Sequence, residues 1–105
     1  MGVVEVHVTF PNAEEARALA RAAVDQRLAA CANIFAGMHS FYWWGGDVQS
    51  EDEVAVVFKT AAKSVDALIA FVVKHHSHEV PAIVVLGPLR GGVSYEEWVE
   101  RETRA

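Results

Sequence analysis

Residues 4–15 read VEVHVTFPNAEE and decide how the chain begins to fold. Apolar and polar side chains alternate from Val4 to Phe10, and a period of two predicts a strand with one apolar face. Pro11 ends this strand, and Asn12 with Glu15 is a variant of the capping box that starts a helix. Apolar side chains then recur at spacings of three and four, so we expect a helix over about residues 13–28.

The middle of the chain predicts a β-hairpin. Residues 31–44 are rich in β-forming side chains, with Gly37 as a bend or bulge, and Gly45-Gly46-Asp47 predicts the turn. The returning strand is predicted over residues 53–60, and five consecutive residues within it, 54–58, are apolar. A strand that is apolar on both faces is expected to be covered on both sides.

A second helix and a fourth strand follow the hairpin. Ser64 is the predicted N-cap of a helix whose apolar row runs from Val65 to His76. Pro81 favours extended backbone at the residue before it, and residues 82–86 are predicted as a strand that Gly87-Pro88 stops.

The last element is predicted as a short helix. Arg90-Gly91-Gly92 reads as a turn, and Ser94 with Glu97 reads as a capping box. The helix that follows carries Tyr95, Trp98 and Val99.

The predicted order is therefore βαββαβ followed by a C-terminal helix. This is the pattern of a ferredoxin-like α+β sandwich, and residues 1–105 form a single domain. Both crossover helices cover one face of the four-stranded sheet. Because the third predicted strand is apolar on both faces, we expect another subunit to cover the open face.

Composition narrows the classes of function. The net charge is -5 and no basic stretch is present, which argues against a nucleic-acid partner. No apolar stretch is long enough for a membrane span, and the first residues lack a signal-peptide pattern, so the cytoplasm is the expected compartment. A single cysteine, Cys31, excludes an intramolecular disulfide and is expected to be a buried thiol.

Three of the five histidines lie within four positions, at His75, His76 and His78, followed by Glu79. Imidazole is a common metal ligand, but helical neighbours at i and i+1 point about 100° apart. His75 and His76 therefore cannot chelate one ion within a regular helix. The alternative interpretation is a helix C-terminus at which the histidines interact with the helix dipole and His76 is partly buried.

The chain resembles the CutA family of divalent-cation tolerance proteins over about residues 3–102. The resemblance rests on the order and spacing of several short motifs: Leu28-Ala29-Ala30-Cys31-Ala32-Asn33-Ile34, Gly37, Tyr42 with Trp44 and Gly46, Glu53-Val54, Lys59-Thr60, His76 with Glu79 and Pro81, and Tyr95 with Trp98. It implies a ferredoxin-like fold close to that of the PII signalling proteins, a homotrimer, and a role in tolerance of copper and other divalent cations.

The resemblance also implies a metal site. The histidine pair proposed to bind copper in some members matches His75 and His76, with Glu79 as a possible third ligand for weakly bound Cu²⁺ or Zn²⁺. The cysteine ligand of those members corresponds to Val8, which cannot ligate. Ser77 and His78 stand where the family commonly has proline and tyrosine.

Other functions are compatible with the same sequence. A PII-like sensor would bind a small anionic ligand between subunits with Lys59, Glu79, Tyr95 or Trp98, and a trimeric scaffold or anchor would bind other proteins. An acylphosphatase-like enzyme is disfavoured, because the segment after the first strand is acidic and lacks glycine and arginine. No nucleophile and general base share one local motif, so we expect a binding or signalling module rather than an enzyme.

Overall fold

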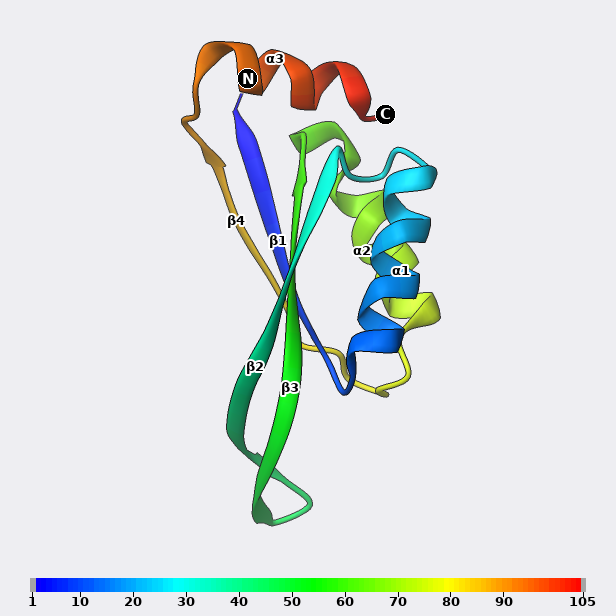
Figure 1. Ribbon diagram of the computed structural model, residues 1–105, viewed down its shortest axis with the longest axis vertical. Coiled ribbons are helices and arrows are strands. Elements are labelled where there is room, and N and C mark those ends of the chain that lie inside the picture. The colour runs from blue at the N-terminus through cyan, green and yellow to red at the C-terminus, as the bar shows by residue number, and fades with distance from the viewer. Residues whose placement is uncertain (1, 105) are drawn as a thin grey trace.

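The computed structural model describes residues 2–104 and has the predicted order of elements. The four strands form one sheet; Figure 1 shows two of the helices against one face of it and the remaining helix across one end. The elements are β1 (Val3–Phe10), α1 (Ala13–Asp25), β2 (Cys31–Trp44), β3 (Asp47–Thr60), a 3₁₀ turn (Ala62–Ser64), α2 (Val65–His75), β4 (Ile83–Leu89) and α3 (Val93–Glu102).

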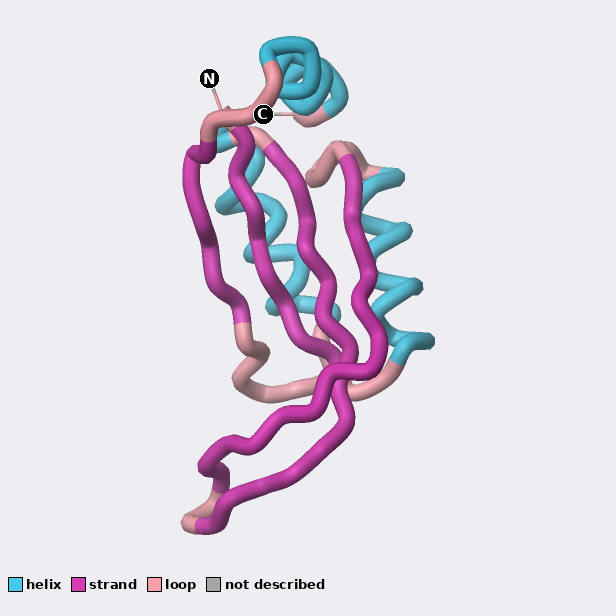
Figure 2. The backbone as a smooth tube through the Cα atoms, turned by 60° about the vertical axis from the view of Figure 1, so that its left-hand side comes forward, coloured by secondary structure: helices cyan, strands magenta, loops and turns pink. Residues whose placement is uncertain are grey.

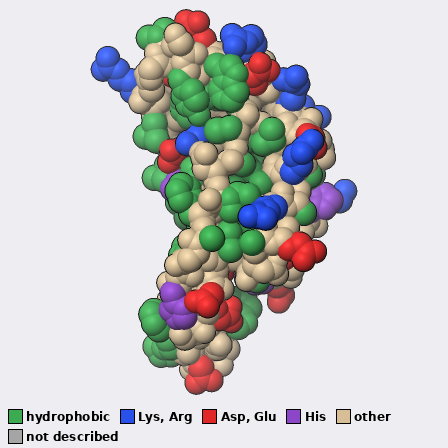
Figure 3. Space-filling model, viewed as in Figure 1, with side chains coloured by type: hydrophobic (Ala, Val, Ile, Leu, Met, Phe, Trp, Pro, Cys, Tyr) green, Lys and Arg blue, Asp and Glu red, His purple; other side chains and the backbone are tan. Residues whose placement is uncertain are grey.

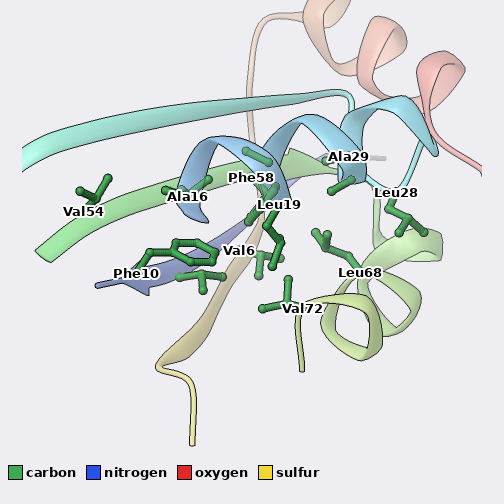
Figure 4. Packing of buried hydrophobic residues seen from close by; sticks show 14 of the residues in the cluster. Val6, Phe10, Ala16, Leu19, Leu28, Ala29, Val54, Phe58, Leu68 and Val72 are labelled. Carbon is green, nitrogen blue, oxygen red and sulfur yellow. The ribbon is translucent and has the colours of Figure 1, made fainter. Parts of the chain in front are cut away.

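The four strands form one antiparallel sheet in the order β2-β3-β1-β4, which is the ferredoxin-like arrangement. The even-numbered side chains of β1 face α1 and α2, and Val6, Val8 and Phe10 are completely buried. Figure 4 shows Phe10, Phe58, Leu68 and Val72 meeting in this core. Small side chains on α1, chiefly Ala16 and Ala23, let this helix approach the sheet closely. Full burial of each large core side chain contributes roughly 1.5–3 kcal/mol.

Strands β2 and β3 continue past the end of β1 as a two-stranded arm, residues 38–53. The last residue of β1, Phe10, pairs with Val54, so the arm lies beyond the four-stranded sheet (Figure 2). Gly37, with φ of 81°, lies in the register shift between Phe35 and Met38, which confirms the predicted bulge. The hairpin turn is confirmed at Gly45 and Gly46, with φ of 64° and 86°, while Asp47 of the predicted turn already pairs with Trp44 as the first residue of β3.

The first helix is shorter than predicted and ends at Asp25. Arg27 adopts a left-handed conformation, with φ of 60°. The Leu28 N–H donates to the Ala23 carbonyl and the Arg27 N–H to the Val24 carbonyl, which is the Schellman pattern. Leu28 fits the apolar periodicity because it is buried in the core, although it reaches the core after the helix has ended.

Two strand boundaries also differ from the prediction. β3 begins at Asp47 rather than at residue 53, because its polar first half pairs with β2 in the arm. β4 continues through Gly87-Pro88 to Leu89 rather than stopping there. One extra residue is accommodated by a bulge opposite Val3 and Glu5, and an edge strand tolerates proline at such a point.

Two predicted helix caps lack the expected side-chain bonds. Ser64 occupies the N-cap position of α2 as predicted, but its hydroxyl donates to the Arg104 carbonyl and makes no capping bond, so Ser64 ties the C-terminal segment to the domain. α3 begins at Val93, before Ser94, and the Glu96 carboxylate accepts the Gly91 N–H at 3.0 Å in place of the predicted capping box.

The cap at Asn12 is confirmed, because its side-chain oxygen accepts the Glu15 N–H at 2.8 Å. The Glu15 side chain, however, hydrogen-bonds to Ser77 instead of completing a capping box.

Candidate functional site

The histidine segment lies where α2 ends and the chain turns toward β4, beside the ends of α1 and β1 (Figure 1). His76 is buried and stacks on Phe10, with ring centroids 4.7 Å apart. The His78 N–H donates to His76 Nδ1 at 3.0 Å, so His76 Nε2 carries the proton and donates to the Thr9 carbonyl at 2.7 Å. His76 therefore holds the segment on the end of β1.

The predicted metal ligands are not gathered around one point. His75 is exposed and contacts Phe71, with ring centroids 4.5 Å apart, while the His76 ring lies 5.0 Å from that of His78. Glu79 is exposed. In residues 2–104 no three His, Cys, Asp or Glu side chains are placed to hold one metal ion. The set His75, His76 and Glu79 stays a prediction.

Ser77 fastens the same segment to α1. The Glu15 carboxylate accepts the Ser77 N–H at 3.0 Å and the Ser77 hydroxyl at 2.6 Å. Partial burial acts to raise the pKa of Glu15, but the two bonds from Ser77 and the nearby rings of His76 and His78 outweigh it, and the pKa is lowered. Sequence reasoning treated Ser77 only as the loss of a turn-forming proline and missed this contact.

Three of the four residues predicted for an anionic ligand lie near one another at the α3 end of the sheet. Lys59 donates to the Asn33 side chain at 2.6 Å and pairs in register with Cys31. The Tyr95 hydroxyl lies 3.5 Å from the Cys31 sulfur, and the Tyr95 ring stacks on Trp98.

Desolvation, with smaller contributions from Cys31 and Glu5, raises the pKa of Tyr95 to about 12. Cys31 was predicted to be fully buried, but the structure shows its side chain half-buried. Glu79, in contrast, lies between α2 and β4 and lines a cavity with Thr9, near the other end of β1, so it cannot join this group within one chain.

The sheet face opposite α1 and α2 carries apolar side chains. Phe35 on β2 and Val84 on β4 are 55% and 58% exposed, and Leu86 is also exposed. Hydrophobic side chains also reach the surface near α3 and on the arm (Figure 3), where Phe41 and Trp43 are more than 70% exposed. A patch of this kind is typical of an interaction surface.

The strand order, the two helices on one face and the additional α3 define a ferredoxin-like α+β domain of the PII-like type. No helix within residues 2–104 has the length and apolar character needed to cross a membrane. The family model described as "CutA1 divalent ion tolerance protein" matches residues 4–102. The chain belongs to this family.

Curated relatives and solved structures of the CutA family are similar to this chain over nearly its whole length. A chloroplastic CutA protein of Oryza sativa is 40% identical over 96% of this chain, and the Thermus thermophilus divalent-cation tolerance protein is 38% identical over 93% of it. The chain spans 57% of the rice protein's length and 95% of the Thermus protein's. The structures of CutA1 from Thermus thermophilus and from Oryza sativa both superpose with a TM-score of 0.93, each over 97% of this chain and over 99% and 94% of their own chains.

Proposed function

We propose that this chain forms a homotrimer that acts in tolerance of divalent cations and binds Cu²⁺ or Zn²⁺ weakly at residues 75–79. The carrying observation is the near full-length similarity to the Thermus thermophilus protein, which is named for divalent-cation tolerance. On this proposal the protein is a binding module rather than an enzyme, and it works in the cytoplasm.

The exposed apolar face supports self-association. Phe35, Val84 and Leu86 would each stay hydrated in a monomer, whereas a second copy placed on the sheet would remove them from water. The trimeric state itself comes from the family resemblance. Light scattering on the purified protein should give a mass three times that of one chain. Val84→Glu should dissociate the trimer, and Val73→Glu, a matched change on an exposed α2 residue, should not. A monomeric wild type would exclude this assembly.

Weak metal affinity follows from the hydrogen bonds of His76. A metal at Nδ1 has to displace the His78 N–H, and leaving such a group without a partner costs about 1–3 kcal/mol. That cost lowers the affinity by roughly one to two orders of magnitude relative to an unobstructed imidazole. His75 and Glu79 are exposed and can turn toward an incoming ion without disturbing the core.

Calorimetric titration with Cu²⁺ and Zn²⁺ tests the site. His75→Ala and Glu79→Gln should each weaken binding, while His39→Ala, a change of an exposed histidine on the arm, should leave it intact. His76→Ala is a poorer test, because it also removes the contact with Thr9. Unchanged affinity in the double variant of His75 and Glu79 would exclude these ligands.

A second candidate function is the binding of a small anionic ligand between subunits. The grouping of Lys59, Tyr95 and Trp98 at one end of the open face favours it, with Glu79 supplied by a neighbouring copy. A thermal-shift screen of nucleotides and organic acids should find a compound that raises the melting temperature with its concentration. The shift should disappear in Lys59→Met and persist in Lys74→Met. A screen without any shift would reject this function.

A further inference from the structure

A cavity of about 670 Å³ lies between the arm and the segment that joins α2 to β4. Figure 2 shows the arm extending beneath that segment. The arm contributes Tyr42, Trp44, Glu51 and Glu53 to the wall, and the segment contributes Glu79 among others. The volume is in the range of small-molecule sites.

Glu53 is the unusual residue of this wall. It is only 8% exposed, yet no group within residues 2–104 donates a hydrogen bond to its carboxylate or forms an ion pair with it. Within residues 2–104, no fully buried side-chain oxygen lacks a hydrogen-bond partner. The Glu53 oxygens, which have no partner, are therefore not fully buried and remain accessible from the cavity. A largely buried carboxylate without a partner is costly, and a cation in the cavity would relieve that cost.

The charged side chains of the wall are mainly acidic. Glu51, Glu53 and Glu79 all line the cavity, and its lining includes no lysine or arginine; His78 is the one basic side chain among the lining residues. The acidic groups also affect the phenol of Tyr42. Partial desolvation, the interaction with Glu51 and the charge of Glu53 raise the pKa of Tyr42. The cavity therefore favours a positively charged occupant.

The chemistry of the wall favours an organic cation over a metal ion. The cavity is far larger than a bare ion, and within residues 2–104 no three carboxylate, imidazole or thiol groups converge as a metal site requires. Tyr42 and Trp44 line the same space, and aromatic rings attract ammonium groups through their π faces.

We propose that this cavity binds a small organic cation, a primary or quaternary alkylammonium. The charged head lies against Glu53 and Glu51, and the alkyl part contacts the ring of Trp44. This site is separate from the proposed metal ligands except for Glu79, so the test is built on Glu53.

The test is a titration of the intact protein, in its own oligomeric state, with n-butylammonium and tetramethylammonium, followed by calorimetry and tryptophan fluorescence. Both probes should bind saturably, and n-butanol, the neutral counterpart, should not. Glu53→Gln should weaken both probes at least tenfold. Asp47→Asn, which removes a carboxylate at the tip of the same arm and outside the cavity, should leave both affinities unchanged.

Trp44→Leu provides a second variant that leaves the acidic wall intact, and it should weaken tetramethylammonium severalfold. Three results would overturn the proposal. The first is no saturable binding of either probe below about 10 mM. The second is equal loss in Glu53→Gln and Asp47→Asn, which would indicate diffuse charge. The third is binding of Zn²⁺ that depends on Glu53 while the ammonium probes do not bind.

Discussion

Replacing Glu15 with glutamine should loosen the segment after α2 and change how stability depends on pH. The Glu15 carboxylate accepts two hydrogen bonds from Ser77, at 3.0 and 2.6 Å. Hydrogen bonds to a charged group contribute about 1.5–3 kcal/mol each when buried. Ser77 is exposed and glutamine keeps one acceptor oxygen, so we expect a total loss of about 1–2 kcal/mol at pH 7.

The pH dependence separates this contact from a general effect of charge. The fold lowers the pKa of Glu15, so the carboxylate stabilises the folded state above its unfolded pKa of about 4.3. That stabilisation is lost as the pH falls through the lower folded value. The difference between wild type and Glu15→Gln should therefore be complete at pH 7 and shrink in strong acid.

Urea unfolding at several pH values and one fixed protein concentration measures this difference. Glu14→Gln is the matched control, because Glu14 occupies the same first turn of α1, is exposed, and does not bond to Ser77. Its loss should stay within about 0.5 kcal/mol. A loss in Glu15→Gln that is equal at pH 7 and pH 3, or no larger than that of Glu14→Gln, would refute the assignment of stability to the contact with Ser77.

Three further predictions concern the core, a cap and a phenol. Leu68→Ala should cost about 2–5 kcal/mol in unfolding free energy, because Leu68 is completely buried; a cost below 1 kcal/mol in chemical denaturation would contradict the described core. Asn12→Ala should cost about 1 kcal/mol through loss of the cap to Glu15, and Asn12→Asp, which keeps an acceptor, should restore most of it. In the Tyr42→Phe variant, ultraviolet titration reports Tyr95 alone and should show its phenolate forming with a pKa of about 12; an ordinary value would contradict its desolvation beside Cys31.

The elements with strong local signals were predictable from sequence. The alternation through β1, the bulge at Gly37 and the turn at Gly45-Gly46 depend on backbone conformations that residue types specify directly. The ferredoxin-like order follows from those signals and is confirmed, and the CutA1 family, which was expected from the resemblance of several short motifs, is confirmed as well.

The features that the sequence did not predict depend on contacts between residues far apart in the chain. Ser64 lies at the N-cap position of α2, but its hydroxyl bonds to the carbonyl of the distant Arg104 and not to the first turn of the helix. Leu28 fits the helical period, yet the chain leaves the helix before it. The cavity around Glu53 joins two segments more than twenty residues apart, and no local pattern indicates that they meet.

The arm also has a consequence for the order of folding. Its two strands are joined by a two-residue turn, so every pair between them closes a short loop, whereas the β1 and β4 pairs join residues about eighty positions apart. Hairpins form in about 1–10 μs, and long-range pairs form later because their loop closure costs more entropy. We therefore expect the arm, with Phe41 and Trp43 on its surface, to exist before the sheet is complete. The two edges of the arm pair with no other strand of the described chain, and the charged residues Glu51 and Asp52 are the kind of edge residue that discourages mispairing with other chains.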